Sequence, residues 1–216
     1  MTAAVRSMLR SAAALGLVAI LGTTLLSGVN RLTAARIAEQ ERRVVLEQLN
    51  QIIHPDRYDN ALQDDWFIFS DEAHFPQGQR VVAYRARSGD DPVAVILRFA
   101  AVDGYNGRID LLLGIAADGR VAGVRVTSHR ETPGLGDAIE ADKSDWVLAF
   151  DGASLERPAP SGWTVRRDGG AFDQFTGATI TPRAVVKAVR RALEYHEANS
   201  DSLYDAASEA MGGEAL

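Results

Sequence analysis

The stretch Asp173–Pro182 (DQFTGATITP) places one carboxylate, three threonine hydroxyls and one glycine within ten residues. An amphipathic pattern that predicts a helix over residues 182–198 follows, with Thr181 suited to the N-cap and Pro182 to the first helical position. The first amide N–H groups of a helix lack intrahelical partners and the helix dipole favours negative charge there, so the stretch indicates an anion site. Two alternatives stay open: the threonines serve only as capping and turn hydroxyls, or the stretch binds a free phosphate without a covalent bond.

A second stretch that could form part of a binding site is Ser128–Asp137 (SHRETPGLGD). It follows a predicted strand and contains two glycines and a proline. A loop of this composition lets a planar ligand approach its backbone closely. His129 and Glu131 could form an acid–base pair, and the alternative is that they make hydrogen bonds that hold the loop. The sequence contains no recognisable Ser-His-Asp arrangement and no histidine pair at metal-ligand spacing. We therefore expect no catalytic residue and no metal site.

The composition narrows the classes of function. The chain has 216 residues, a net charge of -6 at pH 7 and no cysteine. An acidic chain lacks the basic face that nucleic-acid binding requires. The absence of cysteine excludes disulfides, thiolate zinc sites and cysteine-ligated iron–sulfur clusters. Redox chemistry in this chain would therefore require a bound organic cofactor or a partner's cluster.

The residues from Ser11 to Val29 form an uncharged stretch of nineteen residues. As a helix it would be about 28 Å long, close to the hydrocarbon thickness of a bilayer. A cleaved signal peptide is the alternative, but its apolar region is usually shorter and no A-x-A cleavage site follows here. We therefore expect a retained anchor. The short N-terminal tail and the acidic remainder favour translocation of the C-terminal part, although a simple count of flanking arginines opposes it.

The remaining patterns predict the elements that would position these stretches. Helical periodicity is present at 33–53, and strand-like runs occupy 80–87, 93–99, 109–116, 120–127 and 163–167. The run at 109–116 is almost continuously hydrophobic, which is typical of a strand buried on both faces. Asp118-Gly119 marks a tight hairpin turn after it. Strands and helices without regular alternation predict an α+β fold, and the acidic end of the chain is expected to be unstructured.

The motif Asp173-x-x-Thr176-Gly177-Ala178-Thr179 matches the signature D-x-x-[ST]-G-A-T of the FMN-binding domain family. The sequence resembles the G subunits of Rnf (Rsx) ion-translocating electron transport complexes. It is similar, more distantly, to the C subunits of sodium-pumping NADH:quinone oxidoreductases. The resemblance runs through the N-terminal apolar stretch and the segments 104–107, 129–136, 144–146 and 172–186.

The resemblance implies a covalent cofactor. In the family, a flavin transferase esterifies the phosphate of FMN to the last threonine of the signature, which is Thr179 here. Asp173 would be required for that modification, and Arg183 would help to stabilise the phosphodiester. The other residues implied in cofactor binding are Thr176, Gly177 and Ala178 of the signature and Glu131, Thr132, Gly134, Leu135 and Gly136 of the loop, which would line the flavin pocket.

The resemblance also implies an architecture. The expected parts are a tail and transmembrane anchor (1–30), a membrane-proximal helix (31–55), a periplasmic FMN-binding domain with an antiparallel-rich sheet and flanking helices (56–198), and an unstructured acidic tail (199–216). The chain would be a single-pass protein of the bacterial inner membrane.

The implied function is that of an electron carrier, a redox subunit of an ion-translocating oxidoreductase that does not act alone. Its partners would be membrane subunits and iron–sulfur or flavin subunits. Three alternatives stay open. They are a regulatory or sensory membrane protein with the same flavin domain, a C-type subunit of a sodium-pumping quinone oxidoreductase, and a binding or scaffold domain without redox activity.

Overall fold

The structure, a computed structural model, describes residues 3–205 and divides the chain into two units between Val45 and Leu46. The N-terminal helix α1 runs from Ala3 to Asn50 without interruption. Within it Leu15–Ala34 is long and apolar enough to cross a membrane, by length and composition alone. The predicted anchor therefore has a helix that could form it, and the helix predicted to follow the anchor is the continuation of the same α1.

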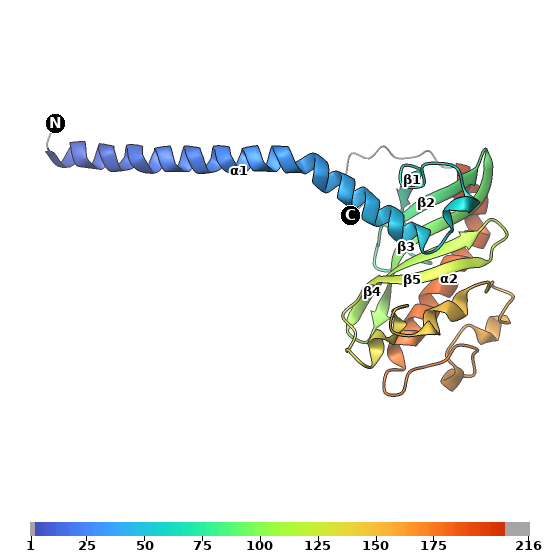
Figure 1. Ribbon diagram of the computed structural model, residues 1–216. Helices are drawn as coiled ribbons and strands as arrows, with labels where there is room; N and C mark the ends of the chain where they lie inside the picture. The colour runs from blue at the N-terminus through green and yellow to red at the C-terminus, as the bar shows by residue number, and fades with distance from the viewer. Residues whose placement is uncertain (1–2, 206–216) are drawn as a thin grey trace. The chain divides into compact units, whose positions relative to one another are not determined.

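The second unit is built on a five-stranded antiparallel sheet whose strands follow the order of the chain (Figure 1). The strands are β1 (Trp66–Phe69), β2 (Val81–Ser88), β3 (Asp91–Gly104), β4 (Gly107–Ala116) and β5 (Val121–Ser128). The α+β class with an antiparallel sheet is confirmed. β2 to β5 were predicted, with the tight turn before β5 at Gly119, whose φ is 80°. β1 was not predicted, because four apolar residues carry no distinctive period.

One face of the sheet is covered by the C-terminal helix α2 (Ile180–Asp205), which packs mainly on β3 and also on β4 (Figure 1). Val185, Val189 and Leu193 recur at helical spacing on its buried side. They join Leu111 and Leu113 of β4 in one hydrophobic cluster. This packing fixes the start of α2 relative to the ends of the central strands.

The other face of the sheet is covered at β4 and β5 by the segment that follows α1. A Cβ atom on Gly114 would lie only 2.2 Å from Cγ2 of Ile52, and one on Gly123 would lie 3.5 Å from Cα of Ile52. These two glycines therefore make room for Ile52. With both faces covered, Leu111, Leu112 and Leu113 are all buried, as their continuous hydrophobic run predicted.

The strand predicted at 163–167 is wrong. Trp163 and Val165 are buried, but the segment forms only one isolated bridge, between Val165 and Phe172. Short 3₁₀ turns lie just before Trp163 and just after Val165. Trp163 instead packs beside Phe150 and Phe172, and its indole N–H donates to the Ser154 carbonyl at 3.1 Å. The alternation of apolar residues reflects a loop that inserts side chains into an aromatic cluster.

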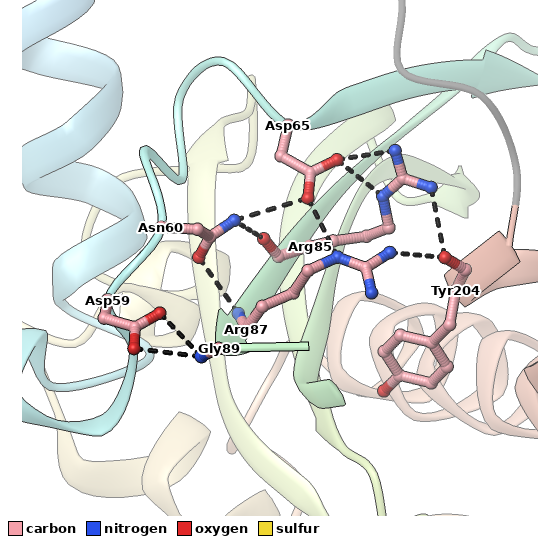
Figure 2. Close-up of polar contacts among 7 residues, drawn as sticks. All are labelled: Asp59, Asn60, Asp65, Arg85, Arg87, Gly89 and Tyr204. Atoms are coloured by element: carbon pink, nitrogen blue, oxygen red, sulfur yellow. Dashed lines mark hydrogen bonds and ion pairs between the residues drawn. The ribbon is translucent and has the colours of Figure 1, made fainter. Parts of the chain in front are cut away.

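The tail predicted to be unstructured from residue 199 is wrong for residues 199–205, because α2 continues through a local kink at Asn199 to Asp205. Figure 2 shows how the end of the helix is held: the guanidinium groups of Arg85 and Arg87 both donate to the Tyr204 carbonyl. Asp65 accepts from the Nε atoms of both arginines, at 2.7 and 3.1 Å. Residues 206–216 of the predicted tail lie outside the described residues.

Candidate functional site

A pocket with a volume of about 190 Å³ lies at the start of α2. Three segments that are far apart in the sequence form its wall: the β3–β4 turn, the loop after β5 and the segment that enters α2. The lining residues are Tyr105, Glu131, Thr132, Leu135, Gly136, Gly177, Ala178, Thr179, Ile180 and Thr181. The pocket thus brings together the two stretches that the sequence singled out.

The three threonines of the signature stretch have different surroundings. Thr176 is exposed and lies outside the pocket lining. Thr181 is fully buried, and its hydroxyl donates to Oε2 of Glu131. Thr179 is half-buried in the pocket wall, and no side-chain hydrogen bond joins its hydroxyl to another residue in the part of the chain that the structure describes. Of the three, Thr179 alone combines a place in the pocket with a hydroxyl that the fold does not use.

The start of α2 differs from the prediction by two residues. The helix begins at Ile180, and the Thr179 carbonyl accepts a hydrogen bond from the Arg183 amide at 3.3 Å. Thr179 therefore has the N-cap position that the pattern assigned to Thr181. The N–H groups of Ile180 and Thr181 lie in the first turn, where helix geometry provides no intrahelical acceptor, and Pro182 has no N–H. The pocket wall therefore includes the positive end of the helix dipole.

Glu131 is the buried carboxylate of the pocket, with 4% of its surface exposed. Its Oε1 accepts from the Asn106 amide at 3.0 Å, while its Oε2 accepts from Thr181. Its own amide donates to Nδ1 of His129 at 3.0 Å, and Nε2 of His129 lies 2.8 Å from Oε1 of Glu140. The geometry therefore favours the second interpretation of His129 and Glu131, in which their hydrogen bonds hold the loop.

A cluster of charges anchors the end of the same loop. Nζ of Lys143 lies 2.9 Å from Oδ2 of Asp137 and 2.7 Å from Oε1 of Glu140. The hydrogen bonds to Glu140 and Asp137 raise the pKa of Lys143 to about 12. The hydrogen bond from Lys143 in turn lowers the pKa of both carboxyl groups, with His129 adding to the effect on Glu140. All three groups are therefore charged at neutral pH and tie the loop to the turn at residue 143.

Three of the expected site residues lie outside the pocket lining: Asp173, Thr176 and Gly134. The exposed carboxylate of Asp173 pairs with Nε of Arg166 at 3.0 Å, and its carbonyl accepts from the Trp146 indole at 2.7 Å. Arg183, expected near the phosphate, also lies outside the lining. It donates two hydrogen bonds to Asp168, at 2.7 and 3.1 Å, and these raise the pKa of Arg183.

The sequence did not single out Tyr105, Ile180 or Thr181 as lining residues. Tyr105 reaches the pocket because β3 and β4 pair up to Gly104 and Gly107, which puts their turn beside the loop after β5. The sequence did offer one signal, an aromatic residue between two glycines at a turn. A turn is exposed, so packing in the core does not account for an aromatic side chain there. Ile180 and Thr181 follow Thr179 directly, so they enter the pocket with the first turn of α2.

Comparison with known proteins supplies the class of protein. A model of the FMN-binding domain matches residues 104–194, a range that includes every residue of the pocket lining. A model of the RnfG N-terminal region matches residues 1–52. The class is therefore a flavin-domain protein whose N-terminal region is that of an RnfG protein.

Similar full-length relatives give the family. The G subunit of the ion-translocating oxidoreductase complex of Pseudomonas aeruginosa (strain UCBPP-PA14) is 50% identical over 210 residues, which cover 97% of both chains. The protein of the same name from Shewanella loihica is 46% identical over 92% of this chain and 93% of its own. For that of Vibrio cholerae (strain M66-2) the values are 44%, 88% and 91%. The chain belongs to this family, the G subunits of ion-translocating oxidoreductase complexes.

Proposed function

We propose that this chain is the FMN-carrying electron-transfer subunit of an ion-translocating oxidoreductase complex, with FMN attached through its phosphate to Thr179. The observation that carries the proposal is the position of Thr179 in a family-matched FMN-binding domain: the residue lines a pocket at the start of α2, and its hydroxyl makes no side-chain hydrogen bond within the described chain. FMN, when bound, supplies the electron-transfer chemistry, and the protein supplies its position and environment.

The groups in the pocket fit a flavin phosphodiester. Such an ester on Thr179 keeps one negative charge, which the N–H groups of Ile180 and Thr181 and the helix dipole would stabilise. Gly177, with φ of 84°, allows the chain to turn sharply just before Thr179. Thr179 is thereby the candidate attachment site, and the first turn of α2 is the phosphate cradle.

The size of the pocket indicates where the rest of the cofactor lies. A volume of about 190 Å³ is below the roughly 300–1,000 Å³ of sites that enclose drug-sized ligands. A flavin attached at Thr179 therefore extends beyond the cavity, over the exposed hydrophobic side chains of its rim. These are Tyr105, Leu135 and Ile180, of which 66%, 45% and 44% is exposed. A partly exposed flavin suits a carrier that exchanges electrons with a neighbouring subunit.

The cellular setting follows from the family and from α1. The relatives are named as subunits of a complex, and Leu15–Ala34 could span a membrane, so we place the chain at the inner membrane among the complex's other subunits. We further propose that the flavin domain faces the periplasm and that a flavin transferase attaches FMN there. A covalent bond would prevent loss of the cofactor outside the cytoplasm. The membrane and iron–sulfur or flavin subunits of the complex are the electron partners in this proposal.

The attachment is tested by producing the full chain together with a flavin transferase. The wild type is expected to gain the mass of FMN less one water and to fluoresce in a denaturing gel. Thr179→Val keeps the shape of the side chain, removes the hydroxyl and should lose both signals. Thr127→Val, which alters a half-buried threonine of β5 outside the pocket, should keep both. An unmodified wild type, or a Thr179→Val chain that still carries flavin, would overturn the proposal.

A further inference from the structure

Glu131 contacts every wall of the pocket, although a carboxylate is an unexpected neighbour for a phosphate. Its loop forms one wall, its Oε1 accepts from the Asn106 amide in the β3–β4 turn, and its Oε2 accepts from Thr181 in α2. Both of these donors are neutral groups. Glu131 and Thr181 are 4% and 0% exposed, so the bond between them is shielded from water. A buried bond of this kind strongly favours one arrangement of the three segments, because breaking it leaves polar atoms unsatisfied.

Two glycines of the pocket segments make room for this carboxylate. A Cβ atom on Gly136 would lie 3.0 Å from Cβ of Glu131 and 3.1 Å from both Oε2 of Glu131 and Oγ1 of Thr181. A Cβ atom on Gly104 would lie 3.0 Å from Oε1 of Glu131 and 2.3 Å from the Gly107 carbonyl. On the side where a Cβ atom of Gly136 would point, the space is thus filled by Glu131 and Thr181, although Gly136 also lines the pocket.

We propose that Glu131 is a positioning residue that joins the β3–β4 turn, the loop after β5 and the first turn of α2, and so directs the Thr179 hydroxyl into the pocket. The inference rests on the proposed attachment of FMN to Thr179. Its physical content is that Glu131 acts through two accepted hydrogen bonds and not through its charge. Glutamine retains an acceptor for the Asn106 amide, and its NH₂ group can donate to the Thr181 hydroxyl. Glu131→Gln should therefore preserve the arrangement that Glu131→Ala destroys.

The test measures the initial rate at which a flavin transferase modifies the purified, flavin-free full chain. Glu131→Ala and Thr181→Val each remove the bond between the loop and α2, and each should slow modification about tenfold or more, because small displacements of a reacting group have large effects on rate. Glu131→Gln and Thr181→Ser should stay within about threefold of the wild type, because their hydrogen bonds can re-form. Thr127→Val serves as the matched control for removal of a threonine hydroxyl.

A second readout separates this inference from the proposed attachment. Hydrogen exchange of the Asn106 amide should accelerate in Glu131→Ala and stay slow in Glu131→Gln, whether or not flavin is attached. If the wild type gains no flavin, the proposed function fails and amide exchange alone decides the role of Glu131. Two results overturn the inference. One is a Thr181→Val chain that is modified at the wild-type rate, and the other is a Glu131→Gln chain as impaired as Glu131→Ala, which would mean that the charge matters.

Discussion

Thr176, Thr179 and Thr181 have the same side chain, and their surroundings separate their roles. The hydroxyl of Thr181 is buried against Glu131, Thr176 is exposed to solvent, and Thr179 lines the pocket. A threonine hydroxyl is a weak nucleophile without an activating base, and the carboxylate that lines the pocket already accepts two hydrogen bonds. If FMN is attached as proposed, the chain therefore presents the hydroxyl and the flavin transferase must activate it.

His196 gives a residue-scale prediction about pH. Its side chain is buried on α2, its Nε2 has no hydrogen-bond partner among the described residues, and burial lowers its pKa below the ordinary value of 6.5. The unfolded chain therefore binds the proton more readily, and stability should fall as the pH drops through 6.5 towards the lower pKa of the folded state. His196→Leu should flatten this dependence. Chemical unfolding of both chains across this range checks it, and an unchanged slope in the variant would contradict it.

Some residues of the site could be predicted from the sequence, and the others depend on contacts between segments that are far apart in the chain. The signature and the glycine loop are each continuous in sequence, and the family resemblance implied that both line one flavin pocket, as Gly177, Ala178, Leu135 and Gly136 do. Tyr105 could not, because its place depends on the pairing of β3 with β4. The binding role expected for Glu131 from the family resemblance likewise gave no sign of its bond to Thr181, which depends on how α2 packs.

At the scale of elements, α2 runs from the candidate flavin site at its first turn, across one face of the sheet, to the contacts with β2 at its end. Its first turn forms part of the pocket, its middle packs on β3 and β4, and its end is held by Arg85 and Arg87. The apolar periodicity predicted the middle of the helix. It did not predict residues 199–205, since that part depends on burial of Leu203 and on arginines from β2. Such long-range contacts leave no local period in the sequence.

The held end of α2 gives an element-scale prediction about stability. The Arg85 side chain is 2% exposed and the Asp65 side chain 19%, so Asp65→Ala leaves a buried guanidinium without this carboxylate. Breaking a buried pair by removing one partner costs about 3–5 kcal/mol. Asp65→Ala should lower the free energy of unfolding by an amount of that order, measured by urea denaturation.

The neighbouring Asp64 is the matched control, because it is exposed and one residue away. Asp64→Ala should change the free energy of unfolding by no more than about 0.5 kcal/mol. Equal effects of the two substitutions would contradict the role assigned to Asp65. Faster amide exchange at the end of α2 in Asp65→Ala alone would locate the damage at the contacts of Arg85 and Arg87 with Tyr204.

At the scale of the whole molecule, the composition and the family agree on where the redox chemistry resides. The chain has no cysteine, so it cannot hold a cysteine-ligated iron–sulfur cluster. Redox chemistry in such a chain requires a bound organic cofactor or a partner's cluster, and the FMN-binding domain match favours the first by naming FMN. The sequence thus predicted the class of function well, because absent residue types and a continuous motif need no folded structure to be recognised.

The division between the two units gives the last prediction, which concerns where the flavin domain begins. The second unit starts at Leu46, well after the apolar segment Leu15–Ala34. A chain that starts at Leu46 should leave the membrane fraction, unfold cooperatively and still accept flavin. A chain that starts at Pro55 has lost the apolar side chains that precede it. The buried ones are Leu49, Ile52 and Ile53, with 0%, 7% and 4% of their surface exposed.

Each of those three side chains contributes about 1.5–3 kcal/mol when fully buried, and a whole domain has only about 5–15 kcal/mol of stability. The chain that starts at Pro55 should therefore melt at a much lower temperature or fail to unfold cooperatively. Loss of Ile52 also uncovers Gly114 and Gly123, which have no side chain to fill the space that it leaves. Thermal unfolding of the two soluble chains decides the matter. Equal melting temperatures would mean that residues 46–54 are a linker and not part of the domain's core.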